Sequence, residues 1–202
     1  MKRIALVVSL ALLGSLSLPA PRATAEVATW NLDPSHTTVG FAVRHMMVSN
    51  VRGTFGKVAG TVKGDPAAPA TATIEATIET ASVDTGNADR DEHLRGADFL
   101  DAAKFPTMTF RSKKITTAAG GKLAVTGDLT LHGVTREVVL DVEELSPPVK
   151  DPYGKVRAGA RLSGKLDRKD FGLSFAKTMD NGGLLVGNEV TLSIEVEAIQ
   201  AN

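Results

Sequence analysis

The chain contains no cysteine among its 202 residues. This absence excludes disulfide bonds, cysteine-ligated zinc, iron–sulfur clusters and a cysteine nucleophile. Aromatic residues are also scarce, with seven Phe, one Trp and one Tyr, so few large side chains are available to fill an interior. Charge of one sign is not in excess, because 23 Lys and Arg balance 23 Asp and Glu. Without a net positive charge or a long basic run, we expect no nucleic-acid partner.

The composition is otherwise that of an ordinary globular protein. Hydrophobic residues make up 43% of the chain and charged residues 23%, which argues against extensive disorder. No stretch rich in Pro, Gly or Ser divides the sequence, and no internal repeat is visible. The sequence therefore predicts one folded domain after its first 25 residues.

Residues 1–25 have the pattern of a cleaved signal peptide. Lys2 and Arg3 precede an apolar run at 4–18, which is shorter than the about 20 residues that cross a bilayer comfortably. Ala23 and Ala25 form the small-x-small pattern that precedes a cleavage site. We therefore predict cleavage before Glu26, a mature domain at 26–202, and a periplasmic location. An uncleaved membrane anchor is the alternative.

Most of the remaining chain alternates apolar and polar residues with a period of two, as half-buried strands do. Eight such segments are centred on residues 39–43, 58–62, 74–78, 108–110, 123–131, 138–142, 156–166 and 190–196. Gly120-Gly121 is the strongest candidate for a two-residue hairpin turn. The alternation stops at 86–103, which predicts a short helix ending near Gly96 and a second helical turn at 97–102. Another turn of helix is expected at 169–173.

Eight antiparallel strands with one apolar face each predict an all-β fold. We expect a closed barrel, because closure removes exposed strand edges, and a β-sandwich is the main alternative. The expected inward positions include several small residues: Gly60, Ala76, Gly127, Ala158, Ala160 and Gly164. These residues could leave an apolar space on the barrel axis, or they could mark tight strand contacts in a filled core. The alternation alone leaves both possibilities open.

Several segments, taken in order, carry a resemblance to a known family. They are WNLDPSHT at 30–37, VGFAVRH at 39–45, VRGTF at 51–55, ASVDTG at 81–86, RDEHLR at 90–95, DFLD at 98–101, FPTMTF at 105–110, GDLTLHGVT at 127–135 and RKDFG at 168–172. The ordered set resembles the YceI-like family of periplasmic polyisoprenoid-binding proteins, from Trp30 to Ala198. No single segment would be specific on its own, and 167–187 matches least well.

The resemblance implies an eight-stranded, lipocalin-like antiparallel barrel with a short helical insertion. It also implies a hydrophobic tunnel for a long isoprenoid lipid, such as an isoprenoid quinone or a prenyl phosphate. Members of the family are not established enzymes, so we expect no catalytic residue, metal or cofactor besides the lipid. A membrane is expected only as lipid donor or acceptor, and a homodimer is left open.

We expect one set of side chains to line this tunnel, selected by strand parity and by the resemblance. The set is Val39, Phe41, Val43, His45, Ile78, Leu94, Phe99, Met108, Phe110, Leu129, Leu131 and Phe171. His45 shares the parity of Val43, so its imidazole could contact a lipid head group at the tunnel mouth. Alternatively, it is a structural histidine that pairs with a backbone group.

The polar residues of the irregular segments also allow two interpretations. Arg90, Asp91 and His93 in the helical insertion could bind a head group, as could Arg168 and Asp170. We favour structural roles for these five, as caps and clamps that use ion pairs and hydrogen bonds.

Asp33, Ser35 and His36 have the residue types of a catalytic triad. They are too close in sequence to converge in an extended strand, and the chain has no nucleophile-elbow pattern. The four histidines, at 36, 45, 93 and 132, lack the spacing of a zinc site. The sequence therefore predicts a lipid-binding protein. The alternatives are a binder of fatty acids or fatty amides, a filled structural barrel, and a lipid-modifying enzyme that uses His45.

Overall fold

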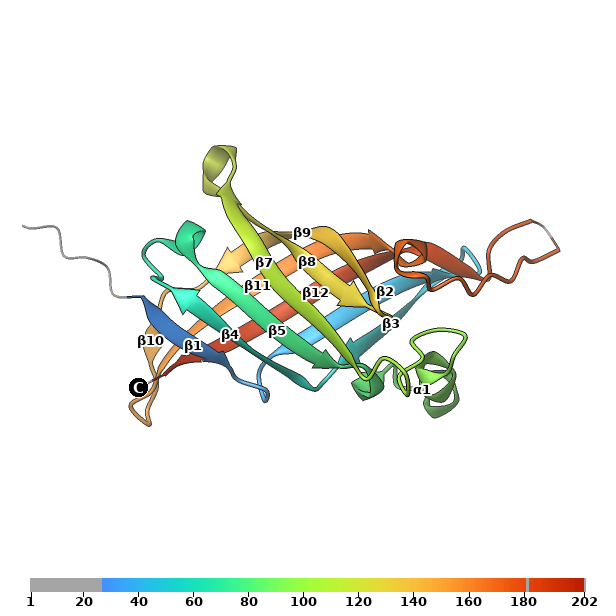
Figure 1. Ribbon diagram of the computed structural model, residues 1–202, viewed down its shortest axis with the longest axis horizontal. Coiled ribbons are helices and arrows are strands. Elements are labelled where there is room, and N and C mark those ends of the chain that lie inside the picture. Colours follow the sequence, from blue (N-terminus) through green and yellow to red (C-terminus); the bar gives the residue numbers. More distant parts are fainter. Residues whose placement is uncertain (1–26, 181, 202) are drawn as a thin grey trace, which may run out of the picture.

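The computed structural model describes residues 27–180 and 182–201. The predicted signal peptide lies outside these residues. Within them, twelve strands form one sheet, accompanied by one α-helix and short 3-10 turns (Figure 1). The strands are β1 (Ala28–Leu32), β2 (Thr38–His45), β3 (Ser49–Phe55), β4 (Val58–Gly64), β5 (Thr73–Glu79), β6 (Val83–Asp84), β7 (Thr107–Thr117), β8 (Leu123–Leu131), β9 (Val134–Leu145), β10 (Val149–Lys150), β11 (Val156–Asp167) and β12 (Val186–Gln200). The helix is α1 (Ala88–Arg95), and the 3-10 turns are η1 (Pro69–Thr71), η2 (Thr80–Ser82), η3 (Ala119–Gly121) and η4 (Arg168–Phe171).

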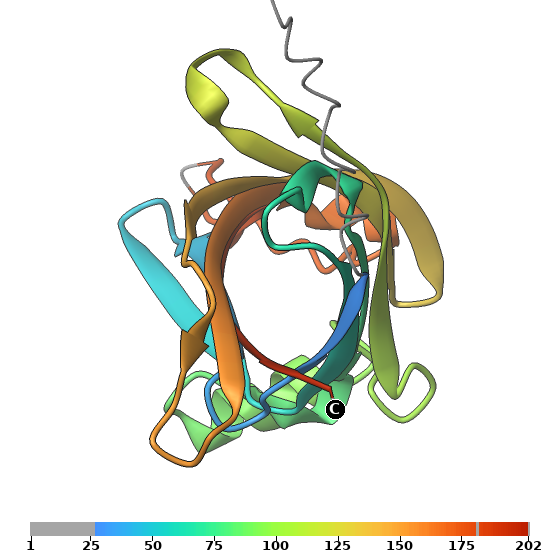
Figure 2. The ribbon, with the colours of Figure 1, turned by 90° about the vertical axis from the view of Figure 1, so that its left-hand side faces the viewer.

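Eight of the strands close into an antiparallel barrel. Their order is β11-β9-β8-β7-β5-β4-β1-β12, and β12 pairs again with β11 to complete the ring (Figure 2). The predicted closed barrel is confirmed, and the alternative of a sandwich is wrong. In the described part of the chain, none of the helices has the length and apolar character needed to span a bilayer.

The long strand β12 joins three neighbours. It pairs with β11 from Glu189 to Ile199, with β2 over its first part and with β1 over its last part. Strands β2, β3 and β6 therefore continue the sheet away from the ring. Figure 1 shows the β2–β3 hairpin and α1 at one end of the barrel, opposite the end that holds β10 and the C-terminus.

Four strands are absent from the sequence prediction, and two of them, β6 and β10, have only two residues each. The chain forms β1 and β3, which the alternation pattern did not identify, and β1 occupies the place in the ring that the segment 39–43 was expected to take. That segment is β2, which pairs with β12 and β3 but with none of the other ring strands. The barrel closes because β1 bonds to β4 on one side and to β12 on the other.

The two-residue hairpin turn lies at a different place from the one predicted. Gly120-Gly121 belongs to a longer loop, in which the Ala118 N–H donates to the Lys122 carbonyl at 2.7 Å. The tight turn is His132-Gly133, between the paired residues Leu131 and Val134. Its φ values of 53° and 74° are the left-handed pair that a type I′ turn requires.

The predicted short helix is α1, and its ends have clear causes. The Asn87 side chain accepts a hydrogen bond from the Arg90 N–H at 2.9 Å and caps the first turn. The helix ends at Gly96, as expected, but 97–102 contains turns rather than a second helical segment. Between β11 and β12, η4 overlaps the region 169–173 where a turn of helix was expected.

Candidate ligand-binding cavity

An apolar cavity of about 530 Å³ lies inside the barrel. All eight ring strands contribute side chains to its wall, and β2 and β3 extend the wall at the end near α1. The lining is almost entirely aliphatic and aromatic. This arrangement follows from the alternation in the sequence, because closing the sheet places one face of every strand inside.

Eleven of the twelve residues expected at the tunnel line this cavity. They are Val39, Phe41, Val43, His45, Ile78, Leu94, Phe99, Met108, Phe110, Leu129 and Leu131. The exception is Phe171, which is 1% exposed in the packed core and is not part of the lining. Their contact with a ligand stays a prediction.

Three aromatic lining residues were not predicted: Trp30, Phe55 and Phe175. Phe55 is the last residue of β3 and is buried. Trp30 lines the cavity from β1 and is buried, but the alternation pattern did not identify that strand. Phe175 lines it from the irregular segment between η4 and β12. The sequence of that segment has no periodicity that could indicate which side chains face inward.

The small residues of the wall divide into two kinds. Ala76, Ala158 and Ala160 line the cavity, as the hypothesis of an open axis requires. The glycines instead allow close contacts within the wall. A Cβ atom at Gly127 would lie 2.5 Å from Cζ of Phe110, so the phenyl ring occupies the place of the missing side chain. The two interpretations of the small residues each hold for part of the set.

The ionisable side chains that line the cavity at the α1 end are all Arg or His. They are Arg44, His45, Arg90, His93 and Arg168. Among the described residues, the His45 imidazole has no hydrogen-bond or ion-pair partner, although its ring lines the cavity. Within residues 27–180 and 182–201, the only carboxylate in the lining is that of Asp65, which follows β4 near the opposite end.

Arg90 and Asp91 hold α1 against Thr85, the residue that follows β6. Asp91 is buried, and its Oδ1 accepts hydrogen bonds from the Thr85 N–H at 2.9 Å and the Thr85 hydroxyl at 2.5 Å. Arg90 donates to Thr85 Oγ1 and to the Thr85 carbonyl, at 2.7 and 2.9 Å. Both residues thus clamp the helix through hydrogen bonds, while Asn87 supplies the cap.

Arg168 has a comparable role on the other side of the cavity. Its guanidinium donates to the carbonyls of Leu173 at 2.5 Å and Gly187 at 2.9 Å, and to Asn188 Oδ1 at 3.3 Å. These bonds fix the two ends of the segment that carries Phe175. Burial lowers the pKa of Arg168 below its usual value. Asp170, in the same turn, is exposed.

An aromatic group connects α1 to that segment. The His93 ring meets Phe99 and Phe175 edge-on, with centroid distances of 5.0 and 5.6 Å, and the two phenyl rings lie 4.7 Å apart. His93 Nε2 also lies 3.1 Å from Asp98 Oδ2. All three rings line the cavity, so they form part of its wall at the α1 end.

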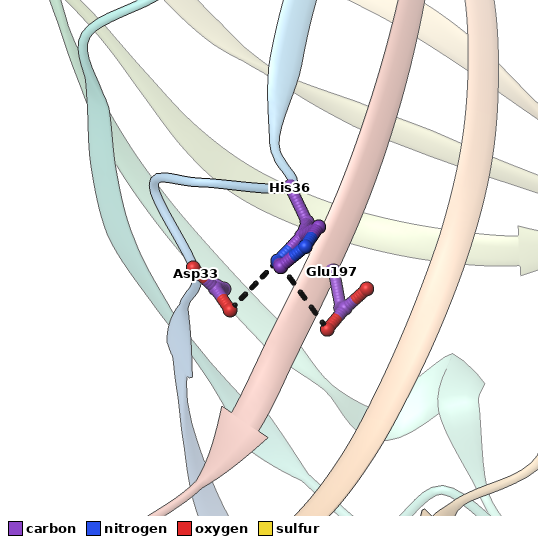
Figure 3. Close-up of side chains that lie close together, drawn as sticks. All are labelled: Asp33, His36 and Glu197. Atoms are coloured by element: carbon purple, nitrogen blue, oxygen red, sulfur yellow. Dashed lines mark hydrogen bonds and ion pairs between the residues drawn. The ribbon is translucent and has the colours of Figure 1, made fainter.

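Outside the cavity, Asp33, His36 and Glu197 gather at the turn between β1 and β2 (Figure 3). His36 Nδ1 lies 3.0 Å from Asp33 Oδ2 and 3.8 Å from Glu197 Oε1. The same two carboxylate oxygens accept hydrogen bonds from Nη1 of Arg157, at 2.7 and 2.5 Å. The guanidinium therefore already supplies the positive charge that a metal ion would bring to these carboxylates.

The contacts of Asp33 are those of a structural turn. The bond from Arg157 holds the pKa of the Asp33 carboxyl well below its usual range, with a smaller effect from His36. Ser35 contributes its backbone N–H, which donates to Asp33 Oδ1 at 2.9 Å. Asp33, Ser35 and His36 thus shape the turn, and their hydrogen bonds do not follow the order of a catalytic triad.

Comparisons with known proteins agree with this architecture. A family model described as the YceI-like domain matches residues 30–198. Protein YceI of Escherichia coli O157:H7 is 41% identical over 186 residues, which cover 91% of this chain and 93% of that protein. The crystal structure of BcnA from Burkholderia cenocepacia superposes with a TM-score of 0.71 at 26% identity, over 82% of this chain and 98% of that one.

A more distant structure shares the fold. It is described as a polyisoprenoid binding domain from Saccharophagus degradans and has a TM-score of 0.59 at 17% identity, over 87% of this chain and all of that chain. The ordered motifs, the closed barrel and the match across 30–198 agree on one assignment. The chain belongs to the family of proteins with a YceI-like domain.

Proposed function

We propose that the protein binds a long isoprenoid lipid, an isoprenoid quinone or a prenyl phosphate, inside its barrel. The observation that carries this proposal is the apolar cavity of about 530 Å³. This volume falls within the range of roughly 300–1,000 Å³ that is typical of small-molecule sites. The description of the Saccharophagus degradans domain as polyisoprenoid-binding supports the choice of ligand.

The free energy of binding would come mainly from the lipid chain. Each buried CH₂ group contributes about 0.8 kcal/mol, so ten such groups contribute about 8 kcal/mol before the cost of association. That amount corresponds to a dissociation constant near 1 μM, and the cost is offset by burying more of the chain. Arg44, His45 and Arg90 would give the head group polar contacts at the α1 end.

We assign no catalytic step to this cavity. An acid–base mechanism at His45 would need a carboxylate or another titratable partner within hydrogen-bond reach. The one lining carboxylate in the described chain is Asp65, which directly follows β4. The arrowhead of β4 lies at the end of the barrel away from α1 (Figure 1). Binding is the activity that the wall supports.

The lipid would be sequestered or carried in the periplasm after export. This part of the proposal rests on the signal-peptide pattern of residues 1–25. N-terminal sequencing of protein from a periplasmic fraction tests it, and the expected first residue is Glu26. An intact Met1, or protein found only in the cytoplasm, would contradict it.

Solvent extraction of the purified protein, followed by mass spectrometry, tests the ligand. The expected result is an isoprenoid lipid in the extract, and uptake of added isoprenoid quinone by the emptied protein. Recovery of fatty acids or fatty amides, with no uptake of quinone, would assign the cavity to a different lipid. An empty extract together with no uptake of any long-chain lipid would refute the proposal.

A further inference from the structure

The tip of the β2–β3 hairpin exposes three consecutive apolar residues. Met46, Met47 and Val48 are 42%, 54% and 75% exposed, and they are the only residues between the two strands. We propose that this hairpin tip docks on an anionic lipid bilayer. The inference rests on the proposed function, since it names the surface from which the bound lipid would be taken or to which it would be delivered.

The backbone conformation of the tip is unfavourable for the apolar side chains that it carries. Met46 and Met47 have φ values of 49° and 62°, in the left-handed region that favours Gly and Asn. Two unbranched apolar side chains are poor choices for that conformation, and a turn sequence such as Asn-Gly would adopt it more easily. Strain of this kind concentrates at functional sites.

The charge of the hairpin itself complements an anionic surface. Residues 38–55, which make up the whole hairpin, include Arg44 and Arg52 but no Asp or Glu. The exposed Arg44 donates from Nη2 to the Met47 carbonyl at 3.0 Å, so its guanidinium lies directly beside the tip. Apolar side chains flanked by arginine are the usual features of a segment that enters the interface of an anionic bilayer.

The hairpin tip is continuous with the cavity. Arg44 and His45, which precede the tip, both line the cavity, and so does Leu185. The Met46 N–H donates to the Leu185 carbonyl at 2.9 Å, which joins the tip to the segment before β12. A bilayer in contact with the tip would therefore face the α1 end of the cavity (Figure 1).

A protein partner fits these features less well. A stable protein interface uses about 20–30 residues on each side, whereas this patch is one turn of three residues. The opposite end of the barrel also exposes apolar side chains, at Val149 and Tyr153. In residues 143–155, Glu143, Glu144 and Asp151 offset Lys150 and Lys155. The charge there is less favourable for an anionic surface than that of residues 38–55.

Co-sedimentation with vesicles tests the proposal directly. Purified protein is mixed with phosphatidylglycerol vesicles or phosphatidylcholine vesicles, neither of which contains isoprenoid. The test variant, M46N/M47G/V48S, removes the apolar side chains and supplies turn residues that suit the backbone, so it should fold at least as well. The matched control, V149S/Y153S, removes exposed apolar side chains at the other end.

The wild type and the control should bind the phosphatidylglycerol vesicles. The M46N/M47G/V48S variant should bind them at least about tenfold more weakly, because it loses the buried apolar area of its tip. Equal binding by this variant, or loss of binding in the control instead, would overturn the proposal. So would equal binding to phosphatidylcholine, or a tip-dependent dimer in sedimentation velocity without vesicle binding.

A separate measurement keeps this inference distinct from the proposed function. Isoprenoid quinone delivered in solution, without vesicles, should bind the M46N/M47G/V48S variant as tightly as the wild type. Quinone binding without vesicle binding by the wild type would reject the docking surface alone. Vesicle binding without quinone binding would instead reject the lipid cavity on which the docking proposal rests.

Discussion

Gly127 shows how a single missing side chain shapes the barrel wall. It lies on β8, and the ring of Phe110 on the neighbouring strand β7 packs over its backbone. A methyl group at this position would lie 2.5 Å from Phe110 Cζ and 2.6 Å from the Arg111 carbonyl oxygen. The Phe110 ring could move away from an added methyl group. The Arg111 carbonyl oxygen could not, because it belongs to the backbone of the paired strand.

We therefore expect Gly127→Ala to destabilise the protein by about 1–3 kcal/mol, the usual cost of overpacking. The free energy of unfolding in urea measures this effect. Gly56→Ala is the matched control, because nothing lies within 4 Å of the added methyl group, and its effect should stay within about 0.5 kcal/mol. Equal effects of the two substitutions would contradict this account of Gly127.

Ala160 provides the corresponding test of the cavity. Its side chain lines the cavity from β11, so Ala160→Phe would fill space that the lipid chain is proposed to occupy. We expect the affinity for isoprenoid quinone to fall by at least about tenfold, since two lost CH₂ contacts already correspond to that change. Titration with quinone measures the loss.

The control for Ala160→Phe adds the same ring outside the barrel. Thr191 is exposed on β12 and faces outward, so Thr191→Phe should leave quinone affinity unchanged. Circular dichroism of both variants verifies that the barrel is folded. Wild-type affinity in a folded Ala160→Phe protein would mean that the lipid does not occupy this part of the cavity.

Individual lining residues were predictable from the sequence only where strands impose a period. Val39, Phe41 and Val43 alternate with polar or small residues, and the pleat of β2 then places all three on one face. Phe171 and Phe175 lie in a segment without such a period. The 3-10 turn η4 directs Phe171 into the core, whereas Phe175 packs against Phe99. That outcome depends on tertiary contacts that no local pattern records.

At the scale of elements, the helix α1 depends on one buried carboxylate. Asp91→Ala would leave the Thr85 N–H and hydroxyl without their acceptor, and a lost hydrogen bond to a charged group costs about 1.5–3 kcal/mol. We expect a loss of stability in that range, together with faster amide exchange in α1. Hydrogen exchange and urea unfolding measure the two effects.

The control lies on the exposed side of the same helix. Asp89 is exposed in the first turn, so Asp89→Ala should remove only a favourable interaction with the helix dipole, which is less than about 1 kcal/mol. Amide exchange in α1 that is unaffected by Asp91→Ala would show that the helix is held by other contacts.

The β2–β3 turn should gain stability from glycine. Met47 has a φ of 62°, and the left-handed conformation costs a residue with a Cβ atom about 1–2 kcal/mol. We expect Met47→Gly to stabilise the protein by about 1 kcal/mol, because part of the relief is offset by the entropy of glycine in the unfolded chain. Thermal unfolding measures the change.

Val48→Gly is the appropriate comparison for this turn. Val48 is not among the residues with a positive φ, so glycine there brings only its entropic cost and should lower the stability. A decrease of similar size in both variants would show that Met47 is not strained.

Alternation identified most strands, but it could not determine which of them closes the ring. Strand β1 has only five residues, and its inward side chains include Trp30 and Leu32. A pattern so short is ambiguous until the strand finds partners on β4 and β12, which lie far away in the sequence. In β3, Gly53 stands at the inward position between Val51 and Phe55 and so weakens the apolar signal.

For the whole molecule, the ion pairs of Arg157 connect segments from both ends of the chain. Its Nε donates to Asp151 at 2.7 Å, and its Nη1 donates to Asp33 and Glu197. These hydrogen bonds hold the pKa of both aspartates below the usual value of 3.8, with Arg157 as the largest cause. A carboxyl group with a lowered folded-state pKa stabilises the fold only while it is ionised.

Stability should therefore be fully present above about pH 5 and fall progressively as the pH drops through 4 and below. Arg157→Gln should lower the Tm at pH 7 and make the Tm less dependent on pH in this acidic range. Thermal unfolding from pH 7 to pH 2 measures both effects. Arg161→Gln, which removes exposed pairs with Glu195 and Glu144, should change the acidic dependence less. An unchanged acid profile in Arg157→Gln would contradict this assignment.

The sequence supported a closed barrel, but it could not show whether the barrel is hollow. Alternating faces and the need to cover strand edges favoured closure, and the family resemblance implied a tunnel. Whether the axis is open depends on the combined volume of side chains from every strand. Ala158 and Ala160 leave room there, while Phe110 fills the space above Gly127. Only the assembled ring determines how these contributions combine.

The position of β12 in the chain has a consequence for biosynthesis. The strand that shuts the ring is the last one in the sequence, and it must pair with β1 near the other end. A nascent polypeptide therefore cannot complete its barrel until β12 has been synthesised, and pairing between such distant segments is slow. Until then the apolar inner surface of the sheet is open to water, which makes the incomplete barrel prone to aggregation.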